Sequence, residues 1–372
     1  MKTKLTIQER LDLIKSVGEE IIGLDELEEL LKLDRELITY DGFEPSGQMH
    51  IAQGIMRAIN TNKMINAGFK FKFYIADWFG YLNKKMGGDL DKIRTVGKYF
   101  VEIWKASGMN MDNVEFAWAS DVVADPGYWE LVMKVAQNTT LNRILRTTQI
   151  MGRSDKDSLQ ASQILYPCMQ AVDIIKLGVD VTQLGMDQRK VYMLARSVFP
   201  QIGFVKPVII SNHMLMGLLP PPPKDSKPIA RKIAMKMSKS KPDSGIFMTD
   251  TKEEIERKLK KAYCPEGVVE DNPILEYCRY ILFEAQHLLG FEDFLKNGLV
   301  VRRLAKFGGD VTYKTYDHLE EAFKEKKLYP LDLKNAVASY VDILIDPVRK
   351  HFNQNKEAKK LNELVQSYQV TR

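Results

Sequence analysis

The chain has 372 residues, 45% hydrophobic and 28% charged, which is typical of a folded protein and argues against disorder. Its length exceeds the size at which a single core usually stops growing, so we expect two domains. No apolar run approaches the roughly 18 residues of a membrane span, so we expect no membrane segment. The net charge of +5 permits a polyanionic partner without requiring one.

The N-terminal part alternates predicted helices and strands. Residues 5–33 place apolar side chains at helical spacing and predict amphipathic helices, and residues 37–43 predict a strand. Further helices are predicted over 49–67, 91–107, 128–151, 161–177 and 189–197. Further strands are predicted over 70–78, 114–119, 179–184 and 206–210. This alternation predicts an α/β fold with a parallel sheet.

The composition changes after residue 219. Residues 220–223 are all proline and begin a stretch rich in lysine, proline and serine that runs to Gly245, which is typical of an exposed connection. Beyond Thr251 the pattern is that of lysine-rich amphipathic helices, and it predicts no strands. We therefore expect an α/β domain over 1–219, a linker over 220–247 and a helical domain over 248–372.

The first motif with chemical content is the turn at residues 40–47 followed by His50-Ile51-Ala52-Gln53-Gly54. The pattern predicts a strand, a tight turn and a helix, with Ser46 as the residue that caps the helix. Backbone N–H groups at the start of a helix suit a phosphate, and His50 in the first turn would donate to a phosphate oxygen. The alternative is an ordinary strand–helix turn with a capping histidine.

The second motif is Lys236-Met237-Ser238-Lys239-Ser240, inside the proline-rich connection. Two ammonium groups on a flexible loop can close over a triphosphate and neutralise the charge that develops on it. The alternative is a pair of solvated linker lysines. The chain has neither of the two common glycine-rich phosphate loops, so a nucleotide would bind without them.

Together the two motifs resemble the signatures of class I aminoacyl-tRNA synthetases. Residues 50–53 are similar to a degenerate HIGH motif, in which Ala52 replaces glycine and Gln53 replaces the second histidine. Residues 236–240 match the KMSKS motif without change. The departure in the first motif leaves His50 to contact phosphate without a second imidazole.

A third pattern concerns the amino acid. Tyr166, Gln170 and Asp173 are spaced so that they share one face of a helix, for which a solvent-facing stripe is the alternative. The runs at 166–173 and 184–190 resemble tyrosyl-tRNA synthetases of the archaeal and eukaryotic type. So do the blocks at 261–265, 306–310 and 332–336, and the resemblance extends from about residue 5 to residue 352.

The resemblance implies a Rossmann-type parallel sheet with a helical insertion at about 126–151, followed by an α-helical anticodon-binding domain. It also implies that ATP, with Mg²⁺ on its phosphates, activates L-tyrosine, which is then transferred to tRNA(Tyr). The insertion resembles the dimer interface of the family, so the resemblance implies a homodimer.

The resemblance further implies residue roles. Tyr40 and Asp173 would bind the substrate phenol, and Tyr166, Gln170 and Gln188 its ammonium group. The implied catalytic residues are His50, Lys236 and Lys239, with no metal held by protein side chains. The implied ATP contacts are Gly42, His50, Gln53, Asp187, Lys236, Met237, Ser238, Lys239 and Ser240. The implied tRNA contacts are Arg189, Phe307 and Asp332.

Three cysteines without a C-x-x-C pair suit a reducing compartment, so we expect a cytoplasmic protein. The nearest alternative function is tryptophan activation on the same fold, which leaves Tyr40 and Asp173 without a hydroxyl to bind. A catalytically weak RNA-binding protein derived from a synthetase is a second alternative; the unchanged residues 236–240 argue against it. A small-molecule nucleotidyltransferase, the third, leaves the basic helical region unexplained.

Overall fold

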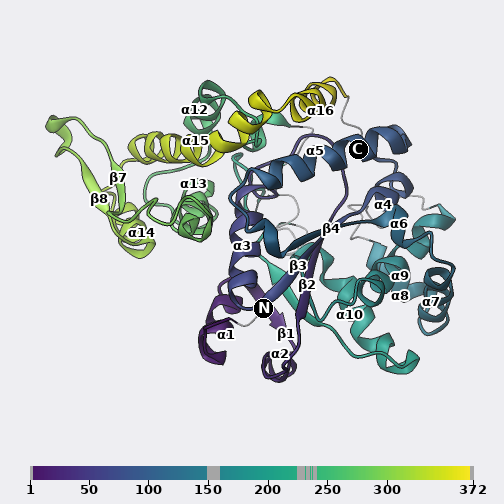
Figure 1. Ribbon diagram of the computed structural model, residues 1–372. Coiled ribbons are helices and arrows are strands. Elements are labelled where there is room, and N and C mark those ends of the chain that lie inside the picture. The colour runs from purple at the N-terminus through teal and green to yellow at the C-terminus, as the bar shows by residue number, and fades with distance from the viewer. Residues whose placement is uncertain are drawn as a thin grey trace.

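The computed structural model describes residues 3–148, 160–223, 231, 235, 237 and 241–368 (Figure 1). Its main element is a six-stranded sheet in the order β1-β6-β5-β2-β3-β4, in which every neighbouring pair is parallel except β1 and β6. The strands are β1 (Gly18–Ile22), β2 (Leu37–Phe43), β3 (Phe69–Ile75), β4 (Val114–Trp118), β5 (Val181–Gly185) and β6 (Val208–Asn212). The predicted α/β class with a largely parallel sheet is confirmed.

Helices cover both faces of this sheet. The longer ones before residue 219 are α1 (Ile7–Lys15), α2 (Leu24–Leu31), α3 (Ile55–Asn66), α5 (Leu90–Lys105), α7 (Pro126–Gln137), α9 (Ala161–Lys176) and α10 (Arg189–Val198). Shorter ones are α4 (Asp77–Leu82), α6 (Ala119–Val122) and α8 (Leu141–Thr147). Strand β3 shows how the faces divide: Phe71 and Phe73 enter the core shared with α3 and α5, whereas Tyr74 enters the core shared with α7, α9 and α10.

Local sequence fixes the start of α7, the helix that later proves to reach the site. Asp125 caps it by accepting a hydrogen bond from the Gly127 N–H at 2.8 Å. Pro126 occupies the first helical position, where its missing N–H leaves no bond unmade. Tyr128, Val132 and Val135 then point inward at helical spacing.

The prediction that residues 5–33 form only helices was wrong, because β1 lies between α1 and α2 and pairs antiparallel with β6. The partner on the sheet edge decides the conformation of so short a segment. The helix predicted over 49–67 begins only at Ile55, with Gly54 as its N-cap, so Ser46 does not cap it. The helix predicted over 128–151 is two helices, interrupted where Thr140 caps α8; residues 149–159 lie outside the described part.

After residue 251 the chain is mainly helical, as predicted. The helices are α12 (Lys252–Lys261), α13 (Pro273–Tyr277), α14 (Tyr316–Lys324), α15 (Pro330–Gln354) and α16 (Lys356–Ser367). The prediction of no strands there was wrong, because β7 (Leu299–Val301) and β8 (Val311–Tyr313) form an antiparallel pair. Strands of three residues are too short to show a two-residue alternation.

The C-terminal helices pack directly on the sheet-bearing part. Helix α16 lies beside α5 (Figure 1), and the ring of Phe352, near the end of α15, is 5.5 Å from the ring of Tyr99 on α5. His351 and Glu102 add a polar contact of 2.7 Å. One apolar core extends across the domain boundaries predicted near residues 219 and 247. The division into domains therefore stays a prediction. In the described ranges, each helix lacks either the length or the apolarity that a bilayer crossing demands.

Candidate active site

The sheet has a switch point between β5 and β2. From there, the chain continues outward through β3 and β4 on one side and through β6 on the other. Ligands of open α/β sheets bind at the carboxyl ends of the strands beside such a point. Tyr40 and Gly42 lie in β2, and Asp187 and Gln188 lie in the short turn Met186–Gln188 that follows β5. The fold therefore brings these predicted site residues to one crevice.

Asp173 lies on the buried side of α9 with 1% of its surface exposed, so the solvent-facing alternative for this stripe is excluded. Its Oδ1 accepts hydrogen bonds from the hydroxyls of Tyr74 at 2.9 Å and Tyr128 at 3.0 Å. Burial raises the pKa of Asp173 to about 8, although these two hydrogen bonds act to lower it. Neither tyrosine could be predicted from the sequence, because Tyr74 and Tyr128 lie 99 and 45 residues from Asp173.

Tyr40 and the two glutamines are joined through a further residue that the sequence analysis missed, Tyr192 of α10. The Tyr40 and Tyr192 hydroxyls are 3.0 Å apart, and Gln170 Nε2 lies 3.5 Å from the latter. Gln170 Nε2 also donates to Gln188 Oε1 at 3.1 Å. Among the described residues, Gln170 Oε1 is buried without a hydrogen-bond partner, so it is an acceptor suited to an ammonium group.

Tyr166 contacts the carboxylate of Glu44. Its hydroxyl donates to Glu44 Oε1 at 2.5 Å, and Lys85 Nζ lies 3.7 Å from the other carboxylate oxygen. Asn83 Nδ2 also donates to Glu44. Glu44 lies in the turn after β2. Its contact with Tyr166 could not be predicted from the sequence, because the two residues are 122 positions apart.

The two signature segments meet at the backbone. His50 forms a β-bridge with Phe247, Ile51 N donates to Ile246 O at 2.8 Å, and Met248 N donates to Met49 O at 2.9 Å. A Cβ on Gly54 would lie 2.3 Å from Met248 Sδ, so a larger residue there would displace the Met248 side chain. The segment after the KMSKS motif is thereby fixed against the HIGH-like motif.

The prediction that His50 lies in the first turn of a helix was wrong. It precedes Ile55, where α3 begins, because residues 49–51 pair with the later segment instead. Backbone N–H groups predicted to face a phosphate are also used within the chain, since Gln53 N and Gly54 N both donate to His50 O. Gln53 itself is half-buried, and its carbonyl accepts from the Trp104 indole at 2.8 Å.

Of the KMSKS motif, the structure describes Met237, while Lys236, Ser238, Lys239 and Ser240 lie outside the described residues. Met237 is buried against Gly245, where an added Cβ would lie 2.6 Å from its sulfur. The Tyr277 hydroxyl of α13 lies 4.0 Å from the same sulfur. The motif is thus attached at its methionine to the C-terminal part of the chain.

Two further observations concern the part of the crevice where a nucleotide is predicted to bind. Asp41 and Arg57 form a buried ion pair at 2.8 Å that joins β2 to α3, and burial raises the pKa of Asp41 to about 7 against the opposing charge of Arg57. An added Cβ on Gly42 would meet the Tyr74 ring at 3.7 Å, an ordinary contact. The fold alone therefore does not require glycine at position 42, which leaves close approach of a ligand as a reason for it.

The predicted tRNA contacts lie outside the crevice. Phe307 is 61% exposed in the turn between β7 and β8, so a core position is excluded for it. Asp332 is in the first turn of α15, whose N-cap is Tyr329, so it is not the cap residue. Tyr329 is itself 58% exposed. Arg189 forms a two-bond ion pair with Glu20 at 2.6 and 3.1 Å.

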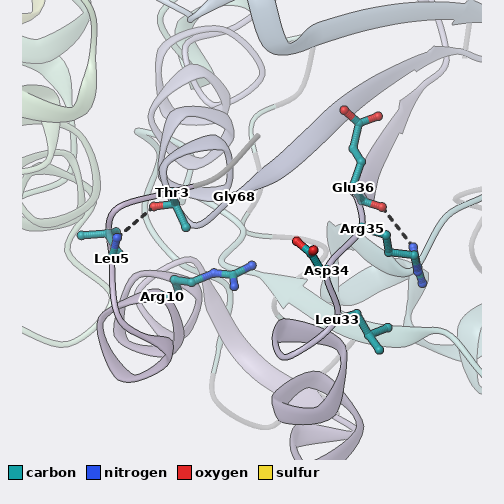
Figure 2. Close-up of a pocket in the computed structure, with 8 residues that line it drawn as sticks. All are labelled: Thr3, Leu5, Arg10, Leu33, Asp34, Arg35, Glu36 and Gly68. Atoms are coloured by element: carbon teal, nitrogen blue, oxygen red, sulfur yellow. Dashed lines mark hydrogen bonds between the residues drawn. The ribbon is translucent and has the colours of Figure 1, made fainter.

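A separate surface pocket of about 430 Å³ lies at the other end of the sheet (Figure 2). Its lining comes from the segments just before β2 and β3 and from the N-terminus. The lining residues are Thr3, Leu5, Arg10, Leu33, Asp34, Arg35, Glu36 and Gly68. Because these are the amino ends of the strands, the pocket is not where a sheet of this kind binds its substrate.

Comparisons with known proteins agree with this geometry. Residues 32–345 match the family described as tRNA synthetases class I (W and Y). The chain is 48% identical over 369 residues to tyrosine–tRNA ligase 1, cytoplasmic, of Arabidopsis thaliana, covering 98% of this chain and 90% of that protein.

Two solved structures are also similar. Tyrosyl-tRNA synthetase of Pyrococcus horikoshii complexed with L-tyrosine is 36% identical with a TM-score of 0.87, covering 96% of this chain and 100% of that one. The Leishmania major tyrosyl-tRNA synthetase in complex with tyrosinol is 41% identical with a TM-score of 0.85. That alignment covers 99% of this chain but 54% of the Leishmania chain, so the present chain spans about half of it.

Proposed function

The chain belongs to the class I tRNA synthetases for tryptophan and tyrosine, and we infer from its site how its residues join L-tyrosine to tRNA. It is an aminoacyl-tRNA synthetase that acts on tyrosine and uses ATP as a substrate. The observation that carries the residue assignments is the cluster of buried side chains that includes Tyr40, Gln170 and Asp173, in which Tyr192 links Tyr40 to Gln170. The roles below are proposed for this chain's own side chains.

We propose that the substrate phenol binds between Tyr40 and Asp173, and that Tyr166, Gln170 and Gln188 hold its ammonium group. The buried acceptor at Gln170 Oε1 supports the second assignment, because an ammonium group would supply the missing donor. The buried Asp173 carboxylate supports the first. An indole or a phenyl ring would leave that carboxylate without its substrate partner, which favours tyrosine over tryptophan and phenylalanine.

In the first step a carboxylate oxygen of tyrosine attacks the α-phosphorus of ATP, and pyrophosphate leaves. The attacking carboxylate is already ionised at neutral pH, so the step needs no general base; it needs positioning and charge stabilisation. We propose His50, Lys236 and Lys239 for the latter. The backbone pairing between residues 49–51 and 246–248 supports their joint action, because it attaches one motif beside the other.

Further contacts with ATP are proposed for Gly42, Gln53, Asp187, Met237, Ser238 and Ser240. Mg²⁺ on the phosphates would add positive charge where the pyrophosphate departs. Gly42 fits close approach of the nucleotide, since the protein's own packing leaves room for a side chain there. Asp187 follows β5 directly, where a carboxylate can accept from a ribose hydroxyl.

In the second step a hydroxyl of the terminal adenosine of tRNA(Tyr) attacks the carbonyl of the adenylate, and AMP leaves. We propose that Phe307 and Asp332 contact the anticodon and that Arg189 contacts the acceptor end. The exposed Phe307 ring supports stacking on an unpaired base. Tyr329 presents a second exposed ring next to the α15 terminus that carries Asp332.

We also propose a homodimer through α7 and α8, a division into domains at 1–219, 220–247 and 248–372, and a cytoplasmic location. The exposed apolar side chains on α7 and α8 support the dimer: Trp129, Met133, Leu141 and Leu145. The location rests on the Arabidopsis relative, which is named cytoplasmic.

Exchange of labelled pyrophosphate into ATP tests the proposal. Exchange that depends on tyrosine, with tryptophan and phenylalanine far weaker, is expected for the full chain. Stronger exchange with tryptophan would overturn the pocket assignment. RNA binding without exchange by any of the three amino acids would favour a non-catalytic protein instead.

A further inference from the structure

Asp173 is held by two tyrosines from distant parts of the chain. Tyr74 comes from β3, on one side of α9, and Tyr128 comes from α7, in the helical insertion. Both hydroxyls donate to the same atom, Oδ1. Among the described residues, Oδ2 of this carboxylate has no hydrogen-bond partner. The two phenols therefore use one oxygen of the carboxylate and leave the other to the pocket.

This arrangement fixes the carboxylate rotationally. A carboxylate with one anchored oxygen cannot turn about its Cβ–Cγ bond without breaking both hydrogen bonds. Tyr40 lies near this carboxylate, since the charge of Asp173 is, after burial, the second cause of the raised pKa of Tyr40. The described residues show no hydrogen bond between Tyr40 and Asp173. The phenolic hydroxyl of a substrate placed between Tyr40 and Asp173 would hydrogen-bond to both side chains.

We propose that Tyr74 and Tyr128 are positioning residues for amino-acid selection, which aim Oδ2 of Asp173 at the substrate phenol. They act through Asp173 and do not themselves contact the reacting atoms. The inference rests on the proposed role of Asp173 and deepens it, because the selective element becomes a three-residue unit built from β3, α7 and α9.

The two tyrosines are not equivalent. In the described part of the chain, the Tyr74 hydroxyl donates only to Asp173. The Tyr128 hydroxyl lies 3.1 Å from Met169 O as well as 3.0 Å from Asp173 Oδ1, so its single proton is shared between two acceptors. Loss of the Tyr74 hydroxyl therefore has the larger effect on the carboxylate.

The electrostatics agree with this ranking of roles. Burial raises the pKa of Asp173, and donation by Tyr74 and then by Tyr128 opposes that rise, so each hydroxyl favours the ionised form. The phenols that face Asp173 from β2, β3, α7 and α9 all have pKa values raised by burial, which keeps them protonated and able to donate.

The test measures kcat/KM of pyrophosphate exchange for tyrosine and phenylalanine in Tyr74→Phe and Tyr128→Phe. The ratio of tyrosine to phenylalanine is expected to fall about 10-fold in the first and about 3-fold in the second, as expected for one lost or shared hydrogen bond. The loss falls on KM for tyrosine, with kcat/KM for phenylalanine unchanged. Tyr99→Phe, which removes a fully buried hydroxyl in the other core, is the control and leaves the ratio unchanged.

Coupling to Asp173 separates this inference from the proposed function. In Asp173→Asn, adding Tyr74→Phe is expected to change the ratio no further, because the hydroxyl acts through the carboxylate. A wild-type ratio of tyrosine to phenylalanine in Asp173→Asn alone would contradict the proposed binding of the substrate phenol by Asp173. A lowered ratio in Asp173→Asn together with wild-type ratios in both single Tyr→Phe variants would overturn the positioning inference. The proposed binding of the substrate phenol by Asp173 would then still hold.

Discussion

The proposed amino-acid pocket and the proposed tRNA-binding surface would recognise their ligands in opposite ways. In the pocket, Tyr40, Gln170 and Asp173 are buried, and each is already hydrogen-bonded to a neighbouring side chain. On the surface, Phe307 and Tyr329 expose 61% and 58% of their area. In the proposed function, the pocket would select because a wrong ligand leaves buried groups unpaired, whereas the exposed rings would stack on an unpaired base of the tRNA.

The difference predicts separable defects. A change in the pocket should alter which amino acid is activated, and a change on the surface should alter charging of tRNA alone. The KMSKS motif belongs to neither region, since it is expected to act on the charge of the triphosphate. Each variant below either confirms that separation or removes it.

The largest effect is expected for Lys239→Ala. Loss of an ammonium group that stabilises developing charge should slow adenylate formation about 100-fold. The affinity for tyrosine should change little, because the pocket is built from other residues. Single-turnover adenylate formation measured against tyrosine concentration separates the two quantities. A proportional loss of tyrosine binding would contradict the assigned role.

Asp173→Ala comes next and probes the pocket side of the comparison. Discrimination between tyrosine and phenylalanine should weaken by about 1–3 kcal/mol, because the group that an absent hydroxyl would leave unpaired is gone. The ratio of kcat/KM for the two amino acids in pyrophosphate exchange gives this value. Unchanged discrimination would remove Asp173 from the pocket.

Phe307→Ala and Asp332→Ala probe the surface side. Loss of the exposed ring or of the carboxylate should lower kcat/KM for tRNA charging about 10-fold, in line with one lost base contact. Pyrophosphate exchange should be unaffected. Leu304→Ala, which removes a 63% exposed apolar side chain from the same turn, is the matched control. Equal loss of charging and exchange would place the defect in folding or in the catalytic site.

The smallest effect concerns a contact between the six-stranded sheet and the C-terminal helices. His213 follows β6 and lies between Glu19 of β1 at 2.5 Å and Glu276 of α13 at 3.1 Å. Glu276 also accepts from Met216 N at 2.7 Å. Burial alone would lower the pKa of His213, but the hydrogen bonds to both carboxylates outweigh it and raise the pKa from 6.5 to about 9.

Because the folded pKa is the higher one, this stabilisation is complete below about pH 6.5 and is lost as the pH rises through about 9. His213→Gln should therefore flatten the decline in the free energy of unfolding over that range by on the order of 1 kcal/mol. Urea unfolding at several pH values measures it. His318→Gln, at an exposed histidine of α14, should keep the wild-type pH dependence. An equal dependence of the free energy of unfolding on pH in both variants would refute the stabilising role of His213.

The sequence determined much of the architecture by local periodicity. The alternation of helix and strand patterns predicted the sheet, and the spacing of Tyr166, Gln170 and Asp173 predicted that they share one helix face, which the structure shows to be buried. These features depend on neighbours within a turn or two of the backbone, which is why a single chain shows them. The lysine-rich helical pattern beyond Thr251 likewise predicted the mainly helical C-terminal part.

Only the tertiary structure decided which side chains meet. Tyr74 and Tyr128 reach Asp173 from 99 and 45 residues away, and Glu44 reaches Tyr166 from 122. The strand β1 exists because β6 offers it an edge, and residues 49–51 leave the helix because the segment at 246–248 pairs with them. Periodicity fixes the face that a residue occupies, but the packing of distant elements fixes its partner, and here the partners set the chemistry of the pocket.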